Sequence, residues 1–98
     1  MRNIVSKSTL REFWEQHPES EQSLRTWYAV VSKATWNNSN EIKVMYKHAS
    51  IIRNSRVVFN ICGNKYRLIV KFEFQKQWAW IRFIGTHAEY DKIDANTI

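Results

Sequence analysis

The apolar and polar positions divide the chain into two parts with different periods. Up to about residue 50, apolar side chains recur three and four residues apart, as on one face of a helix. From Arg56 onward they recur every second residue, which is typical of strands that bury one face. This order predicts an α+β fold in which N-terminal helices pack on one face of a mainly antiparallel sheet.

Three helical segments are expected in the first part. Thr9 and Glu12 have the spacing of a capping box. The short helix that they begin should end near His17, before Pro18. Ser20 can cap a second helix with the clearest helical pattern of the chain, whose apolar positions are Leu24, Trp27, Tyr28, Val31 and Ala34. After the polar loop 37–40, a third segment is expected around Ile42, Met45, Tyr46 and Ala49.

The segments 56–61, 65–74 and 78–84 are rich in aromatic and β-branched residues and predict three strands. Two short turns join them, so the strands should form an antiparallel meander. The first turn, Gly63-Asn64, has Gly at its first central position and fits a two-residue type II′ hairpin. After the last strand, Thr86 can cap a short C-terminal helical turn.

The two turns fix the pairing register of both hairpins. Both registers assign the same residues to the same face of the sheet. Leu68 should lie opposite Phe59 on one side and opposite Phe83 on the other. One face is almost wholly apolar and needs the helices as its cover. The opposite, basic face consists of Arg56, Val58, Asn60, Lys65, Arg67, Ile69, Lys71, Glu73, Trp78, Trp80, Arg82 and Ile84. No predicted helix is left to cover this basic face, so we expect it to be open.

The length of 98 residues predicts a single domain, 1–98, and a hydrophobic content of 44% is that of an ordinary globular protein. The lone Cys62 cannot form an internal disulfide, and no apolar run is long enough to cross a membrane. We therefore expect a cytoplasmic protein without a membrane partner. The formal charge is +6, of which +5 falls in residues 41–98. An anionic partner should meet this C-terminal part.

The basic face has the chemistry of a nucleic-acid site. Arginine and lysine neutralise phosphates, and flat rings such as that of Trp80 stack on unpaired bases. Arg67 and Lys71 lie on the central predicted strand, where no cation is needed to protect a sheet edge. Two other interpretations stay open: a merely solvated face, and an adaptor surface for an acidic protein. The histidines and Cys62 show no metal-ligand spacing, so neither a metal nor another cofactor is expected.

Two segments carry a resemblance to a known family. VFNICGNKYRLI at 58–69 and IGTHAEYDKI at 84–93 closely resemble the HigB toxins of bacterial type II toxin–antitoxin systems, within the RelE-like superfamily. The order of elements, helices before a basic meander, is compatible with that fold. The resemblance implies an mRNA interferase that cuts messenger on the ribosome without a metal ion.

The resemblance also implies roles for three residues. Arg67 matches the strand arginine that contacts the scissile phosphate, and Tyr90 resembles the C-terminal tyrosine that stacks on or orients the substrate base. His87 follows the last strand, where relatives place Arg or His, and would act as the acid or the base. The alternative for His87 and Tyr90 is a capped terminal turn in which Tyr90 packs on the sheet edge.

Further residues are expected to contact RNA or the ribosome: Lys43, Lys47, Arg56, Asn60, Lys65, Lys71, Trp80 and Arg82. For Lys43, Lys47 and Lys65, plain solvation is the alternative. The implied partners are a HigA-like helix-turn-helix antitoxin, mRNA on the ribosome, and operator DNA reached only through the antitoxin. A non-catalytic RNA- or ribosome-binding module with the same basic face is the competing function.

Overall fold

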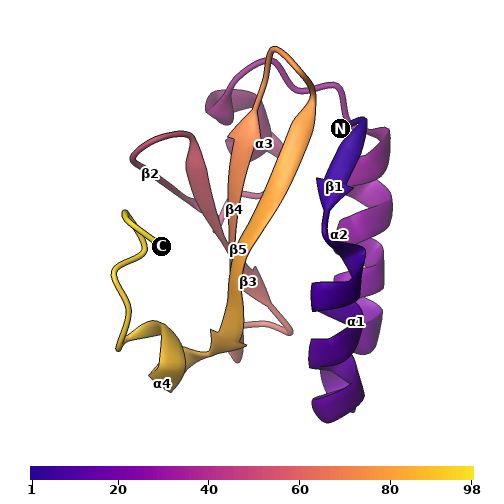
Figure 1. The fold of residues 1–98 in the computed structure, drawn as a ribbon, viewed down its shortest axis with the longest axis vertical. Helices are drawn as coiled ribbons and strands as arrows, with labels where there is room; N and C mark the ends of the chain where they lie inside the picture. The colour runs from indigo at the N-terminus through magenta and orange to yellow at the C-terminus, as the bar shows by residue number, and fades with distance from the viewer.

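The computed structural model describes residues 1–98, and Figure 1 shows their arrangement. The helices α1 and α2 lie on one side of the sheet, whereas α4 and the C-terminal segment lie on the other side. The expected α+β architecture is confirmed. In chain order, the elements are β1 (Asn3–Val5), α1 (Lys7–Gln16), the 3₁₀ turn η1 (Pro18–Ser20), α2 (Glu21–Lys33), α3 (Ser39–Met45), β2 (Ser50–Ile52), β3 (Arg56–Ile61), β4 (Tyr66–Glu73), β5 (Trp78–Thr86) and α4 (His87–Tyr90).

The sheet has five strands in the order β1-β5-β4-β3-β2. Its centre is the predicted meander β3-β4-β5, in which neighbouring strands are antiparallel. The two edge strands were not predicted: β1 pairs in parallel with β5, and β2 pairs antiparallel with β3. Each has only three residues, too few for an alternating pattern to be recognised.

The first helix begins at a different cap from the one predicted. The Ser6 hydroxyl accepts the hydrogen bond of the Thr9 amide at 3.4 Å, so Ser6 is the N-cap of α1. The expected capping box of Thr9 and Glu12 is therefore wrong, since both residues lie inside the helix. The second helix follows Ser20 as predicted, although the Ser20 hydroxyl donates to the His17 carbonyl at 2.7 Å and does not cap α2.

One core joins the apolar face of the sheet to α1 and α2. The buried core residues that come from the sheet are Val57, Phe59, Ile61, Tyr66, Leu68, Val70, Phe72 and Ala79. These positions all belong to the face that the alternation predicts to be covered. Trp27 of α2 meets Phe59 edge to face, with ring centroids 5.5 Å apart. Each such fully buried side chain stabilises the fold by about 1.5–3 kcal/mol. This core fixes the position of the sheet and therefore of the basic face on its opposite side.

A register shift next to Arg82 moves the end of β5 against β4. Leu68 pairs with Ile84 and not, as predicted, with Phe83. An extra residue in one strand inverts the alternation of the residues that follow. The predicted faces of these two residues are therefore wrong. Ile84 packs against the core, and Phe83 lies beside Tyr90, with ring centroids 6.5 Å apart.

The turn between β3 and β4 also differs from the prediction. Both Cys62 and Gly63 have positive φ, at 57° and 68°, whereas a type II′ turn at Gly63-Asn64 needs a positive φ at Gly63 alone. The register of the hairpin is unaffected. Phe59 lies opposite Leu68, as predicted.

Contrary to the prediction, the basic face is not open along its whole length. Residues 91–98 lie on this side of the sheet (Figure 1), and the carbonyl oxygen of Ile98 accepts hydrogen bonds from Arg56 and Arg82. Two aliphatic side chains assigned to this face, Val58 and Ile69, are buried. At the other end of the face, Arg67 is only partly buried and lies next to α4.

Candidate nucleic-acid interface

Arg67 lies on the central strand β4, opposite Asn60 of β3 and Gly85 of β5. Its guanidinium donates to Asn64 twice, to the backbone carbonyl at 3.1 Å and to the side-chain oxygen at 2.8 Å. None of the three ion pairs of the chain involves Arg67. Neutral acceptors therefore fix the orientation of the guanidinium, and its charge stays available to an anion.

Tyr90 lies beside Arg67, although it comes from α4. The guanidinium carbon is 6.0 Å from the centroid of the Tyr90 ring. A complete capping box begins α4: the Thr86 hydroxyl accepts from the Glu89 amide at 3.1 Å, and the Glu89 carboxylate accepts from the Thr86 amide at 2.8 Å. These hydrogen bonds lower the pKa of Glu89, because they stabilise its charged form. An isolated helix of four residues is unstable, so the capping box helps to position Tyr90.

His87 is the first residue of α4 and is exposed. It shares one helical turn with Tyr90, as the Thr86 cap predicts. Its Nδ1 lies 3.1 Å from Oδ2 of Asp91, and it forms no hydrogen bond with Arg67. The structure therefore brings Arg67 and Tyr90 into contact and places His87 on the adjoining exposed turn, paired with Asp91.

A row of cationic and aromatic side chains crosses the basic face beyond Arg67. Arg56, Lys71 and Trp80 are direct neighbours on three adjacent strands. A cavity of about 330 Å³ beside them is lined by Lys71, Glu73, Trp80 and Arg82. Lys71 lies four positions after Arg67 on β4, about 13 Å at the rise of a strand. Four of the predicted RNA contacts thus share one end of the basic face.

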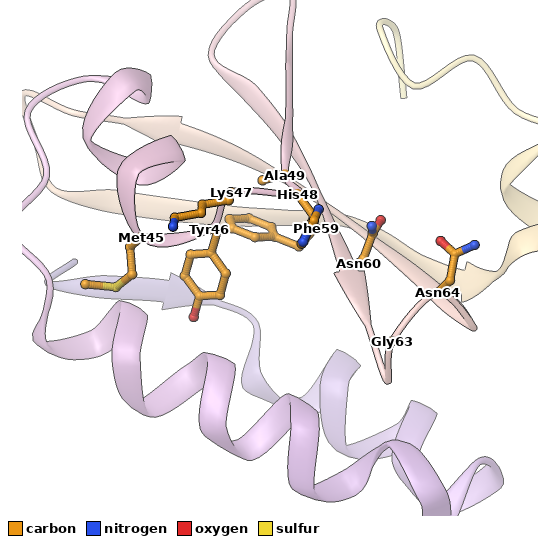
Figure 2. Close-up of a pocket in the computed structure, with 9 residues that line it drawn as sticks. All are labelled: Met45, Tyr46, Lys47, His48, Ala49, Phe59, Asn60, Gly63 and Asn64. Carbon is orange, nitrogen blue, oxygen red and sulfur yellow. The ribbon is translucent and has the colours of Figure 1, made fainter.

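A larger cavity, of about 580 Å³, lies at the edge of β3. Figure 2 shows its polar lining: Lys47 and His48 come from the segment after α3, and Asn60 and Asn64 come from β3 and its turn. Its volume is in the range of small-molecule binding sites. Because Asn64 also binds Arg67, the predicted contacts Lys47 and Asn60 belong to the surroundings of Arg67.

Lys65 does not lie on the basic face. Its Nζ is 3.1 Å from Oε1 of Glu19, an oxygen that also accepts a hydrogen bond from the Tyr66 hydroxyl. These contacts lower the pKa of Glu19 to about 2, chiefly through the Tyr66 hydrogen bond. They connect the junction of α1 and α2 to the turn between β3 and β4. The predicted position of Lys65 on the basic face was therefore wrong, and its contact with RNA stays a prediction.

Lys43 is also engaged within the protein, because its ammonium group donates to the backbone carbonyl of Ala49. This bond joins α3 to the residue before β2. Lys43 would have to release the carbonyl before it could contact RNA, and its role too stays a prediction.

Sequence analysis missed two residues that shape this site, Asn64 and Phe83. Asn64 was predicted only to lie in a turn. Asparagine in a turn often binds nearby backbone groups, but no pattern in the sequence identifies Arg67 as the donor to Asn64. Phe83 was assigned to the core because a register shift cannot be seen in the alternation of the sequence.

The chemical groups of the site are guanidinium, ammonium, phenol, imidazole and amide. No three side chains of the His, Cys, Asp and Glu type lie together in a way that could hold a metal ion. None of the helices has the length and apolar character needed to cross a membrane.

These features define a small α+β protein with cations and aromatic rings on one face of its sheet. The profile of the HigB toxin family, described as the RelE-like toxic component of a toxin–antitoxin system, matches residues 20–93. Because this match covers most of the chain, the protein belongs to the HigB toxin family. The resemblance carried by the two sequence segments is thereby confirmed. The toxic component of such a system has an antitoxin as its partner.

Curated relatives cover nearly the whole chain. The mRNA interferase HigB of Escherichia coli O6:H1 (strain CFT073) is 26% identical over 93 residues, which cover 93% of this chain and 90% of the relative. The mRNA interferase toxin HigB of Escherichia coli K12 is 23% identical over 91 residues, which cover 91% of this chain and 88% of the relative. The mRNA interferase HigB of Shigella flexneri is similar to the same extent.

Proposed function

We propose that this protein is an mRNA interferase, an endoribonuclease that cuts messenger on the ribosome without a metal ion. The observation that carries the proposal is the contact between Arg67 and Tyr90 at the exposed end of the basic face. A guanidinium without a carboxylate partner suits a phosphate, and a ring held beside it suits the adjoining base. Family membership and the names of the relatives support the same activity.

The proposed reaction uses a nucleophile that the substrate already contains. The ribose 2′-hydroxyl attacks the adjacent phosphorus as a base takes its proton, and the P–O5′ bond breaks as an acid protonates the leaving oxygen. The products are a 2′,3′-cyclic phosphate and a 5′-hydroxyl. Arg67 stabilises the extra negative charge of the phosphorane, and positioning of the RNA lowers the barrier further.

Tyr90 and His87 have separate parts in this proposal. Tyr90 stacks on the base next to the scissile phosphate, with its ring kept in place by Arg67 and Phe83. His87 exchanges a proton as the acid or the base, a function worth about 10²- to 10⁴-fold in rate. Its pairing with Asp91 orients the imidazole through Nδ1 and leaves Nε2 for the substrate.

The remaining contacts follow the basic face and the edge of β3. Arg56, Lys71, Trp80 and Arg82 bind the RNA strand beyond Arg67, and Lys47 and Asn60 bind it from the cavity at β3. Lys43 and Lys65 contribute less, because each already has a partner in the protein. Such a set of exposed cations also fits contact with ribosomal RNA.

The antitoxin partner is proposed to be a HigA-like protein with a helix-turn-helix domain. The complex then reaches operator DNA through the antitoxin alone. Copurification with the product of an adjacent gene, followed by operator binding of the complex and of each component, tests this. Operator binding by the toxin alone would contradict it.

Messenger cleavage tests the main proposal directly. The chain is expressed briefly without an antitoxin, and 5′ ends of messenger are mapped and assayed for a 5′-hydroxyl. We expect new ends with the unchanged chain and a loss of at least about 10²-fold with Arg67→Ala, as for removal of a main charge-stabilising donor. Arg11→Ala is the matched control, because Arg11 is an exposed arginine of α1 with no partner.

Two outcomes would contradict parts of the proposal. If no new ends appear and Arg67→Ala is equally toxic, the protein is not a nuclease. Growth arrest with ribosome binding that His87→Ala and Tyr90→Ala leave unchanged would instead support the non-catalytic RNA-binding module. Cleavage of free messenger by the purified protein at the same rate with and without ribosomes would contradict ribosome dependence.

A further inference from the structure

The carbonyl oxygen of Ile98 lies between two arginine side chains of the basic face. Arg56 donates to it from Nε at 3.1 Å and from Nη2 at 2.8 Å, and Arg82 donates from Nε at 3.2 Å. Arg56 is only 7% exposed, so its guanidinium is held in place. Three N–H groups from two cations therefore converge on one main-chain oxygen.

No carboxylate side chain forms an ion pair with either of these two cations. The ion pairs of the chain are Arg25–Glu21, Lys65–Glu19 and His87–Asp91, all elsewhere. Lys71 adds a third positive charge next to Arg56 in the sheet, and Glu73 is the one acidic side chain that lines the adjoining cavity. Like charges gathered at a partly buried site repel one another. A phosphodiester offers anionic oxygens that would satisfy the same N–H groups.

The segment that supplies this oxygen makes few hydrogen bonds to the rest of the protein. The turn is formed by Asp94, whose carbonyl accepts from the amides of Thr97 and Ile98, both at 3.1 Å. Apart from the two arginines, its polar contact with the sheet is the Arg53 amide, 3.4 Å from the side-chain oxygen of Asn96. The side chains of residues 91–98 carry a net charge of −1, and five of these eight residues are exposed. Segments with few buried contacts open at low free-energy cost.

We propose that Arg56 and Arg82 form a phosphodiester subsite, and that residues 94–98 occupy it in the free protein and compete with RNA for it. The identity of the polyanion rests on the proposed function. Arg56 lies opposite Lys71, about 13 Å along the sheet from Arg67, so one RNA strand over the basic face reaches Arg67 and the subsite. The segment lowers the apparent RNA affinity in proportion to the fraction of molecules in which it is closed.

RNA binding by a chain without residues 94–98 tests the competition. The probe is a short single-stranded RNA with 2′-O-methyl groups, which cannot be cut through its 2′-oxygen, so that binding is measured apart from cleavage. We expect the truncated chain to bind about tenfold more tightly, as when nine molecules in ten are closed. An unchanged Kd in a truncated chain that keeps its thermal unfolding transition would overturn the proposal.

The arginines are tested in the truncated chain, where the competing segment is gone. Arg82→Gln should weaken binding about tenfold and reduce the slope of log Kd against log salt by about one. Arg11→Gln on α1, which removes the same charge far from the basic face, should change neither. If Arg82→Gln has no more effect than Arg11→Gln, the subsite does not exist. If truncation tightens binding equally in chains with and without Arg82→Gln, the segment does not act through the arginines.

Hydrogen exchange of the full chain serves if the truncated chain does not fold. Addition of the RNA should increase deuterium uptake in the peptide that contains residues 94–98 and decrease it in β4. Unchanged or decreased uptake in that peptide would overturn the proposal. Messenger cleavage is scored separately: a chain that cuts messenger but shows no effect of its C-terminal segment overturns only this inference, and the converse result overturns only the proposed function.

Discussion

The Arg67 guanidinium and the Tyr90 ring lie 6.0 Å apart, although one residue is on the central strand and the other on the terminal helix. Each is oriented by a different neighbour: Asn64 accepts from Arg67, and Phe83 packs near Tyr90. An interaction between a guanidinium and an exposed ring is worth about 0.5–1 kcal/mol. This contact is therefore too weak to hold α4 alone. In the proposed function, it places a phosphate ligand next to a stacking surface.

The first prediction separates the ring of Tyr90 from its hydroxyl. Tyr90→Phe keeps the aromatic surface, so we expect messenger cleavage to stay within about threefold of the unchanged chain. Tyr90→Ala removes stacking worth about 1–3 kcal/mol per base and should lower cleavage at least tenfold. Mapped 5′ ends with matched protein levels provide the measurement. Equal losses in the two variants would instead assign the function to the hydroxyl.

The second prediction concerns Gly85, which pairs with Arg67 across the sheet. A Cβ at this position would lie 2.6 Å from Cζ of Phe83 and 3.0 Å from Oε1 of Glu89. Gly85→Ala should therefore displace the Phe83 ring and strain the capping box of α4, at a cost of about 1–3 kcal/mol for overpacking. We expect a lower urea midpoint and reduced cleavage.

A second substitution provides the control for Gly85. Phe83→Ala removes the atom that the new Cβ meets, so the double variant Gly85→Ala/Phe83→Ala should recover part of the stability lost by Gly85→Ala, relative to Phe83→Ala alone. A cycle of the four chains gives the coupling free energy. Strict additivity would show that the strain arises elsewhere.

The third prediction is a pH dependence of stability that comes from Glu19. Its pKa is about 2 in the folded protein, against an ordinary value of 4.5. A depressed folded pKa contributes stability above the unfolded value, and this stability is lost as the pH falls through the folded value. The contribution of Glu19 should thus be complete above about pH 5 and decline between about pH 4.5 and 2.

Unfolding in urea at several pH values tests this with two variants. Glu19→Gln should unfold more easily than the unchanged chain at neutral pH, and the difference should shrink toward pH 2. Tyr66→Phe removes the hydrogen bond that lowers the pKa most, so its acid transition should move to higher pH. A difference between Glu19→Gln and the unchanged chain that is constant over this range would contradict the assignment.

The buried face of the meander could be predicted from the sequence, because the two turns independently assign the same residues to it. Positions such as Phe59, Leu68 and Val70 are buried as predicted. The parallel strand β1 could not be predicted, because three residues are too few to show an alternating pattern and its partner β5 lies far along the chain. The register shift beside Arg82 could not be predicted for another reason. With or without the shift, an apolar residue, Ile84 or Phe83, lies opposite Leu68.

The sequence suggested the residues of the candidate site but only part of their arrangement. Segment 84–93 made His87 and Tyr90 candidates, yet the contact of Tyr90 with Arg67 depends on the direction in which α4 leaves β5. Alternation placed Lys65 on the basic face, but residues in a turn do not follow the period of the strands. The C-terminal segment has no apolar period either, so nothing in the sequence indicated that Ile98 would reach Arg56.

The fourth prediction compares two lysines that the sequence placed on the same face. Lys71 lies on β4 between Arg56 and Trp80, with no carboxylate partner, whereas Lys65 is paired with Glu19 on the helix side. Lys71→Ala should weaken RNA binding and reduce the salt slope by about one, because it removes one phosphate contact. Lys65→Ala should leave RNA affinity almost unchanged and lower the urea midpoint instead, since it removes a partner of Glu19. Each substitution deletes one lysine charge, so a general loss of attraction to RNA would affect both equally. If Lys65→Ala weakens RNA binding as much as Lys71→Ala does, net charge and not the position of Lys71 in the sheet governs affinity.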